Sequence, residues 1–173
     1  MKNKIRMRAS IECVAGFVTL AFAVTAAAAD GTAKGSLTYQ AKAGPITMTP
    51  KFVYLVKGPD AVDTNMIIRH VIFSATDLGA KIAACNTMSC TNSNLGNGMT
   101  VDLDAGPRLN YWVVLNDQRV QYSGTARPAA LVLTTNTPAR LAGKLSIDDA
   151  AAGGPKVDIE FDVPLSKEMK QPR

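Results

Sequence analysis

A regular alternation of apolar and charged residues near the C-terminus constrains the fold more than any other feature of this chain. In the stretch KVDIEFDVPL, residues 156–165, Val157, Ile159, Phe161 and Val163 alternate with lysine, aspartate and glutamate. Such a period of two residues is typical of a β-strand, in which successive side chains point to opposite faces. We therefore predict a strand with one face in the core and the other in solvent.

The preceding stretch RLAGKLSI, residues 140–147, has the same alternation, with Leu141, Leu145 and Ile147 on its apolar side. The intervening DDAAAGGP carries two glycines and a proline, so the two stretches form a predicted hairpin. Further stretches that are apolar, β-branched or alternating occur upstream. They are GSLTYQA, ITMT, FVYLV, MIIRHVIFS, MTVDLD, NYWVVLN, RVQYSG and ALVLTT.

The number and spacing of these stretches indicate the fold class. We expect eight or nine strands with a turn roughly every ten residues. This predicts an all-β domain formed by a single antiparallel two-sheet sandwich, with a barrel as the alternative. Trp112 in a central strand gives the predicted sandwich an immunoglobulin-like architecture, although the cysteines lie too close in sequence to bridge two sheets. One helical turn is predicted in TDLGAKIAAC, where Leu78, Ile82 and Cys85 share a helix face.

The N-terminal segment, residues 1–29, has the three parts of a secretory signal peptide. A basic opening, MKNKIRMRAS, precedes an uncharged apolar run, CVAGFVTLAFAVTAAAA, that ends in small residues. We predict cleavage after Ala29, with Ala28 or Thr25 as alternatives, and a mature β-sandwich domain over residues 30–173. The competing interpretation is an uncleaved membrane anchor, but this alanine-rich run is short for a span of about 20 residues.

Cleavage would place the mature protein in the periplasm or outside the cell and leave no stable membrane span. It would remove four of the 19 Lys and Arg and one of the 14 Asp and Glu, so the formal net charge falls from +5 to +2. The remaining basic residues are scattered along the chain, which argues against binding to nucleic acid. The mature length of 144 residues suits a single domain.

Two cysteines, Cys85 and Cys90, remain in the mature chain because Cys13 leaves with the signal peptide. Disulfides form and persist in exported proteins, so we predict a structural Cys85–Cys90 disulfide. Redox-active thiols and a metal site are the alternatives. Four residues separate the cysteines, whereas only two separate the cysteines of a thioredoxin-like redox motif. A zinc site would need two further ligands.

Residues that could support catalysis are few. His70 is the only histidine of the chain and lies in a strand-like stretch, so we interpret it as satisfied by a backbone partner. The sequence has no nucleophile elbow, no zinc-protease helix and no phosphate-binding glycine loop. We therefore predict neither an enzyme nor a cofactor. A structure in which His70 lines a cleft beside a carboxylate would favour an enzyme instead.

Two groups of residues could bind a metal. Asp102 and Asp104 share one face of a predicted strand and, with Asp77 or Asp148 nearby, could bind calcium or act as a glycosidase pair. We interpret them as the solvated face of an edge strand, where charges prevent aggregation. Thioethers together with His70 could hold copper(I), although no Met-x-x-Met run is present and core packing also explains the methionines. The methionines concerned are Met48, Met66, Met88, Met99 and Met169.

Aromatic and arginine residues on one predicted hairpin form a candidate contact surface. They are Arg108, Tyr111, Trp112, Arg119 and Tyr122. Such clusters serve protein or glycan contacts when they face solvent and pack in the core when they face inward. Alternation places Tyr111 and Trp112 on opposite faces, so a sheet buried on one side cannot bury both. The polar segment 85–98, expected to be a loop held by the disulfide, is a second candidate contact.

The order of several fold-making stretches resembles a group of exported bacterial β-sandwich proteins with no assigned activity. The stretches are KGSLTY, FVYLV, IFSATDLG, and RLAGKLSI followed by KVDIEFDVPL. The resemblance implies the fold and export, and it carries no site residues. We therefore predict a non-catalytic exported protein that binds another protein or a cell-envelope component. The alternative is a periplasmic protein that binds a metal or small ligand through His70, methionines or the Asp102/Asp104 pair.

Overall fold

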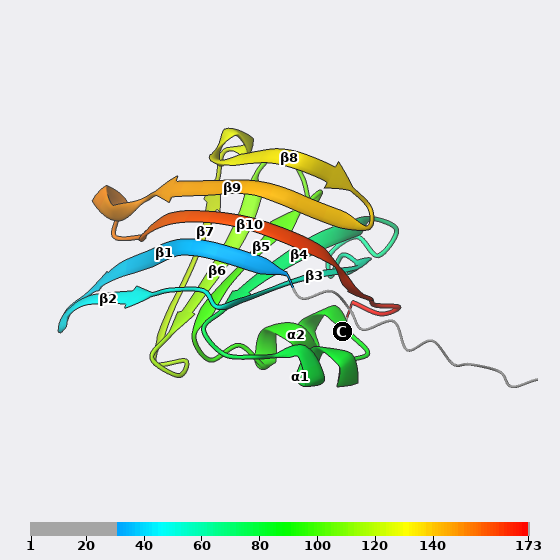
Figure 1. Ribbon diagram of the computed structural model, residues 1–173, viewed down its shortest axis with the longest axis horizontal. Helices are drawn as coiled ribbons and strands as arrows, with labels where there is room; N and C mark the ends of the chain where they lie inside the picture. Colours follow the sequence, from blue (N-terminus) through cyan, green and yellow to red (C-terminus); the bar gives the residue numbers. More distant parts are fainter. Residues whose placement is uncertain (1–30, 173) are drawn as a thin grey trace, which may run out of the picture.

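The computed structural model describes residues 31–172, which form ten β-strands, two short α-helices and two 3-10 turns (Figure 1). The strands are β1 (Thr32–Ala41), β2 (Gly44–Met48), β3 (Phe52–Pro59), β4 (Ile67–Ser74), β5 (Gly98–Leu103), β6 (Leu109–Leu115), β7 (Val120–Ala126), β8 (Leu131–Thr137), β9 (Arg140–Asp148) and β10 (Pro155–Glu168). The helices are α1 (Gly79–Ala84) and α2 (Met88–Ser93), and the 3-10 turns are η1 (Pro128–Ala130) and η2 (Ala150–Ala152). The predicted signal peptide and its cleavage site lie outside the described residues.

The strands form one continuous sheet that curls into a half-barrel (Figure 1). Hydrogen-bonded neighbours follow the order β2-β1-β10-β3-β4-β5-β6-β7, and β9 and β8 continue from β10 on the side opposite β1. Each stretch predicted to be a strand overlaps an observed strand, so the all-β class is confirmed. No helix in residues 31–172 is both long and apolar enough to cross a membrane.

Strand β10 makes the sheet continuous because it belongs to both halves. Its first part, up to Pro164, pairs antiparallel with β1 and β9, whereas its last part, Leu165 to Glu168, pairs parallel with β3. The register shifts between Leu165 and Lys167, where the strand passes from one half to the other. The prediction of two separate antiparallel sheets is therefore wrong, and an immunoglobulin-like architecture is not supported.

The inner face of the curled sheet holds the larger apolar core. Phe73 of β4 meets Phe161 of β10 edge to face, with ring centroids 5.4 Å apart. The alternation predicted for β10 is confirmed, because Val157, Ile159, Phe161 and Val163 are buried and the residues between them are exposed or half-buried. Apolar side chains from the two halves thus bury one another, and this burial stabilises the curl.

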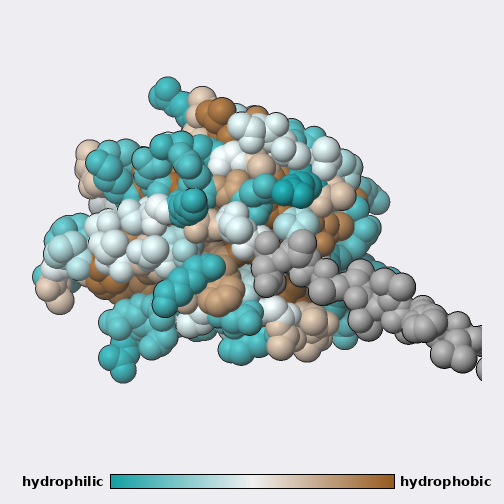
Figure 2. All heavy atoms as spheres, in the orientation of Figure 1, coloured by the Kyte–Doolittle hydropathy of each residue, from teal (hydrophilic) through white to brown (hydrophobic). Residues whose placement is uncertain are grey.

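The outer face of β9 and β10 is hydrophilic, and charges on neighbouring strands are paired. Lys144 Nζ lies 2.8 Å from Asp158 Oδ1, and Arg140 Nη2 lies 2.7 Å from Asp162 Oδ2. Figure 2 shows this face of the molecule, on which teal and white spheres predominate. Exposed ion pairs contribute at most about 1 kcal/mol each, so these charges favour solubility more than stability.

The outer face of the other half is partly covered by α1, α2 and the C-terminal residues (Figure 1). Leu78, Ile82 and Cys85 are buried there, which confirms the predicted helix face. They pack in one cluster with outer-face residues of the sheet, namely Tyr54, Val56, Ile72 and Val114. The loop predicted over 85–98 instead contains α2, which begins at this point because the Thr87 side chain accepts a hydrogen bond from Cys90 N.

Candidate functional site

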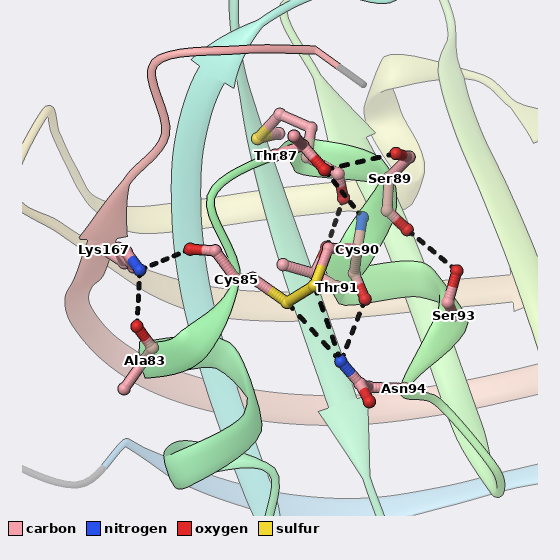
Figure 3. The surroundings of a disulfide bond; sticks show 10 residues. Ala83, Cys85, Thr87, Ser89, Cys90, Thr91, Ser93, Asn94 and Lys167 are labelled. Carbon is pink, nitrogen blue, oxygen red and sulfur yellow. Dashed lines mark hydrogen bonds between the residues drawn. A yellow bond between two sulfur atoms is a disulfide. The ribbon is translucent and has the colours of Figure 1, made fainter.

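A disulfide bond joins α1 to α2 (Figure 3). Cys85 follows the last residue of α1, Cys90 lies in α2, and their Cα atoms are 5.6 Å apart, so the predicted structural disulfide is confirmed. Lys167 Nζ of β10 donates to the carbonyl oxygens of Ala83 (2.6 Å) and Cys85, and Asn94 Nδ2 donates to that of Cys90 (3.0 Å). The bonds of Lys167 hold the end of α1 against β10, and the disulfide links α2 to it. The start of α2 is also held by the C-terminal segment, because Met88 N and Ser89 N donate to the carbonyl oxygens of Gln171 and Pro172.

Next to α2, the sheet places a histidine beside a carboxylate. His70 of β4 and Asp102 of β5 are cross-strand partners, and His70 Nδ1 donates to Asp102 Oδ1. His70 is only 4% exposed, and its partner is a side-chain carboxylate rather than the backbone group expected. The interpretation of Asp102 as part of a solvated edge strand is wrong, because β5 lies between β4 and β6.

A small cavity of about 110 Å³ lies between this pair and α2, and we call it the His70 pocket. Its lining includes Ile68, His70, Met88, Ser89, Asn92 and Asp102. Two buried polar atoms, His70 Nε2 and Asn92 Oδ1, have no hydrogen-bond partner among the described residues. Leaving a buried polar atom unpaired costs about 1–3 kcal/mol, so two of them at one cavity indicate capacity for a ligand.

Asp104 does not join Asp102 in a shared site. It adopts a positive φ of 70° just after β5 ends. Its carboxylate accepts from Arg69 Nε (2.6 Å) and Nη2 (3.0 Å), whereas Asp102 binds His70. The two aspartates therefore have different partners, and the prediction of them as a metal or glycosidase pair receives no support. No cluster of three or more His, Cys, Asp and Glu side chains suited to a metal occurs in residues 31–172.

The position of His70 meets the condition set for an enzyme. It lines a cavity beside a carboxylate, as the acid and base residues of a hydrolytic triad do. Ser89 also lines this cavity, but its hydroxyl lies within hydrogen-bond distance of Thr87 Oγ1, at 3.4 Å. In the described part of the chain, no hydrogen bond joins Ser89 to His70. The arrangement thus lacks an activated nucleophile.

A larger open groove of about 600 Å³ lies over the outer face of β5, β6 and β7, and we call it the outer groove. Its lining includes Thr100, Asp102, Asn110, Trp112, Ser123 and Thr125, with Asn92 of α2. Asn92 and Asp102 also line the His70 pocket, so the two hollows adjoin. The groove combines one tryptophan and one carboxylate with hydroxyl and amide groups.

The five residues of the predicted aromatic and arginine surface do not lie on one surface. Tyr111 and Tyr122 pack in the inner core, with ring centroids 6.1 Å apart. Trp112 lies on the opposite face of the sheet and borders the outer groove. Arg108 precedes β6 and Arg119 follows it, so these exposed residues are separated by roughly 20 Å of strand.

Several residues of the two hollows were not identified as candidates from the sequence, namely Thr100, Asn110, Ser123 and Thr125, and Asn92 was covered only by the candidate contact segment 85–98. The period-two pattern could have identified most of them, since Thr100 shares a strand face with Asp102, and Asn110 with Trp112. Asn92 carries no such signal, because its position depends on how α2 packs on the sheet. Comparison with models of protein families, with curated proteins and with solved structures finds no match to this chain.

Proposed function

We propose that this chain is an exported, non-catalytic binding protein and that the outer groove receives a saccharide of the cell envelope. The observation that carries the proposal is the lining of the groove, in which a tryptophan lies among hydroxyl and amide groups. Small-ligand sites are concave, have volumes of about 300–1,000 Å³, and combine an apolar surface with a few polar groups. The outer groove matches this description in volume and in its mixed lining, and it is open to solvent along its length.

The individual side chains suit a polyhydroxylated ligand. The indole of Trp112 offers a flat apolar surface on which the C–H face of a sugar ring can pack. Asn110, Ser123 and Thr125 offer donors and acceptors to hydroxyl groups. Asp102 binds His70 through Oδ1, so its second oxygen can accept a hydrogen bond from the ligand. No lysine or arginine lines the groove within residues 31–172, which disfavours a phosphate-rich ligand.

Export is part of the same proposal. Residues 1–29 have the pattern of a signal peptide, and the Cys85–Cys90 disulfide suits an oxidising compartment. The resemblance to exported bacterial proteins supports the same location, the periplasm or the cell exterior. The intact mass of protein produced in a bacterial host tests this step. A mass that matches residues 30–173 supports cleavage, and a full-length mass contradicts it.

The binding experiment uses the only tryptophan of the chain, because Trp112 borders the groove. We expect its fluorescence to change saturably when oligosaccharides released from peptidoglycan or lipopolysaccharide are added to the exported protein. The substitution Trp112→Ala should weaken binding, measured by calorimetry, by about 30-fold, as expected for a central contact residue.

The matched control is Thr134→Ala, in an open hollow on the outer face of the other half of the sheet. This variant should bind the saccharide as the wild type does. If no envelope saccharide binds, or if Trp112→Ala binds as tightly as the wild type, the outer groove is not a saccharide site.

A further inference from the structure

We propose that the His70 pocket binds a copper(I) ion through His70 Nε2, the Met88 thioether and Asn92 Oδ1. The site adjoins the outer groove but takes a different ligand, so its test does not depend on saccharide binding. Four features of the pocket support this assignment: the orientation of the imidazole, a second unpaired acceptor, an adjacent thioether, and the charge and size of the cavity.

The imidazole is already arranged as a metal ligand. Nδ1 donates its hydrogen to Asp102, which leaves the lone pair on Nε2. Metal-binding histidines almost always donate their other ring N–H to a carboxylate, a backbone carbonyl or water. The bond fixes the tautomer and the orientation of the ring. His70 is 4% exposed, and no group in residues 31–172 pairs with Nε2.

Asn92 supplies a second unpaired acceptor to the same cavity. Its Oδ1 atom is buried and has no hydrogen-bond partner in the described part of the chain. Neither Oδ1 nor the Nε2 lone pair of His70 carries a hydrogen, so the two atoms cannot satisfy each other. A cation between them would satisfy both.

Met88 brings a thioether to this place. A Cβ atom on Gly58 would lie 2.9 Å from Met88 Sδ, so the sulfur rests directly on the outer face of β3. Gly58 pairs with Ile68, which is two residues from His70 on the same face of β4. The thioether therefore lies over a position diagonal to His70 on the outer face, and both side chains line the same pocket.

This set of donors selects the ion. Thioether sulfur favours copper(I) over calcium, magnesium and manganese, and imidazole is also a good copper ligand. Structural zinc sites use four ligands from cysteine, histidine and carboxylates, and the described residues offer no such cluster. Copper(I) accepts as few as two ligands, and the imidazole and the thioether supply these two. Asn92 Oδ1 is a hard oxygen donor and would be only a weak third contact.

The charge and size of the pocket also suit a cation. Two carboxylates, Asp60 and Asp102, lie in its lining, and no lysine or arginine among the described residues lies there. A volume of about 110 Å³ exceeds the roughly 30 Å³ of one water molecule, so the pocket has room for an ion and one water ligand.

The first test is a titration of the exported protein, without a polyhistidine tag, against a chromophoric copper(I) chelator. Oxygen is excluded, and ascorbate rather than a thiol keeps the copper reduced, because a thiol would open the disulfide. We expect one copper(I) per chain. His70→Gln should lower the affinity by about 100-fold and Met88→Leu by about tenfold, since each removes a ligand. Asp102→Asn should lower it by about 10- to 100-fold through the orientation of His70.

The matched control is Met66→Leu, because Met66 is a 37% exposed methionine that is not among the residues lining the pocket. Its affinity for copper(I) should equal that of the wild type. Zinc(II) is the comparison ion. Met88→Leu should leave the affinity for zinc(II) unchanged, because a thioether contributes little to zinc binding.

A second measurement uses the wild type alone and does not require any variant to fold. His70 is the only histidine, so its ring nitrogens give a single set of heteronuclear NMR signals. Copper(I) should shift the Nε2 signal while Nδ1 keeps its hydrogen. Absence of a one-to-one complex, an Nε2 signal that copper does not move, or tighter binding of zinc(II) than of copper(I) would overturn the assignment. A pocket that holds only water would give the first two results.

Discussion

The two faces of the curled sheet differ in how completely their side chains are satisfied. The inner face is apolar and closely packed, and the Tyr111 hydroxyl on that face is bonded to Asp149. The outer face of β3 to β7 is covered only in part by α1 and α2. The two buried side-chain atoms that lack a partner in the described chain, on His70 and Asn92, both lie there. The inner face thus stabilises the fold, and the outer face retains unused capacity for a ligand.

The largest effect expected from this comparison is on stability, for a substitution in the inner core. Phe73 is 1% exposed and contacts Phe161, so Phe73→Ala should lower the free energy of unfolding by about 3–5 kcal/mol. Val132 is an apolar residue of β8 that is 63% exposed, and Val132→Ala should change the free energy by at most about 0.5 kcal/mol. Urea denaturation of both variants measures the difference.

The reverse result would break the comparison. If Val132→Ala costs as much as Phe73→Ala, then Val132 is covered by a part of the chain or a second copy, and the outer face is not open there. Equal slopes of the two urea transitions are needed for this conclusion, because a changed slope would indicate a change in the unfolded state.

The next effect concerns the helices that cover the outer face. Removing the disulfide by Cys85→Ser with Cys90→Ser should lower the free energy of unfolding by about 2 kcal/mol, as the entropy of closing so short a loop predicts. Lys167 would still bond to the carbonyl oxygens of Ala83 and Cys85. We therefore expect faster hydrogen exchange in α1 and α2 and unchanged protection in the strands of the inner core.

Hydrogen exchange followed by mass spectrometry separates the two faces in this variant. If β4 and β5 lose protection together with the helices, the outer cover and the inner core unfold as one unit. The distinction between a fold-bearing face and a ligand-bearing face would then fail. Loss of protection only in α1 and α2 would show that the helices on the outer face open independently of the inner core.

The inner face was the predictable part of this fold, for a physical reason. Burial on one side of a strand imposes a period of two on the residues themselves, so Val157, Ile159 and Phe161 reveal their orientation locally. The helix face of Leu78 and Ile82 is likewise a local pattern. The half-barrel was not predictable in this way, because the sheet becomes continuous where Leu165 of β10 pairs with Leu55 of β3, far away in the sequence.

The candidate site depends on two non-local facts that the sequence does not carry. Alternation predicts an outward position for Asp102, but the stretch around His70 is apolar on both faces and gives no such signal. Their pairing also requires the register of β4 against β5 across the connection 75–97. Register follows from packing of the whole sheet, and a shift by one residue would place both side chains on the other face. Asn92 joins them because α2 is tied to the end of α1 by the disulfide and to the C-terminal segment by the bonds of Met88 N and Ser89 N.

The smallest effects concern two tyrosines that donate to aspartates on opposite faces. Tyr111 lies on the inner face, and its burial and its bond to Asp149 raise the pKa of its phenol well above the usual range. Tyr54 lies on the outer face under α1, where burial and a 2.6 Å bond to Asp77 raise its pKa to about 12. A raised pKa means that the folded state favours the protonated phenol. This contribution is present below the ordinary pKa of 10.0 and is lost as the pH rises through the folded value.

The substitution Tyr111→Phe should therefore lower the free energy of unfolding at neutral pH by about 1.5 kcal/mol, and Tyr54→Phe by about 1 kcal/mol. Between pH 10 and 12 the wild type should lose stability as Tyr54 ionises, whereas Tyr54→Phe should lose less over the same interval. Urea denaturation at several alkaline pH values, with tyrosinate absorbance of the folded protein, measures both.

Tyr54 also accepts a hydrogen bond from Leu78 N at 2.8 Å, at the start of α1. Loss of the Tyr54 hydroxyl should therefore loosen the helices on the outer face. Tyr111→Phe should leave them unchanged, since its partner Asp149 lies at the turn between β9 and β10. If both variants instead loosen α1 equally, the two faces are coupled through the sheet and do not act independently.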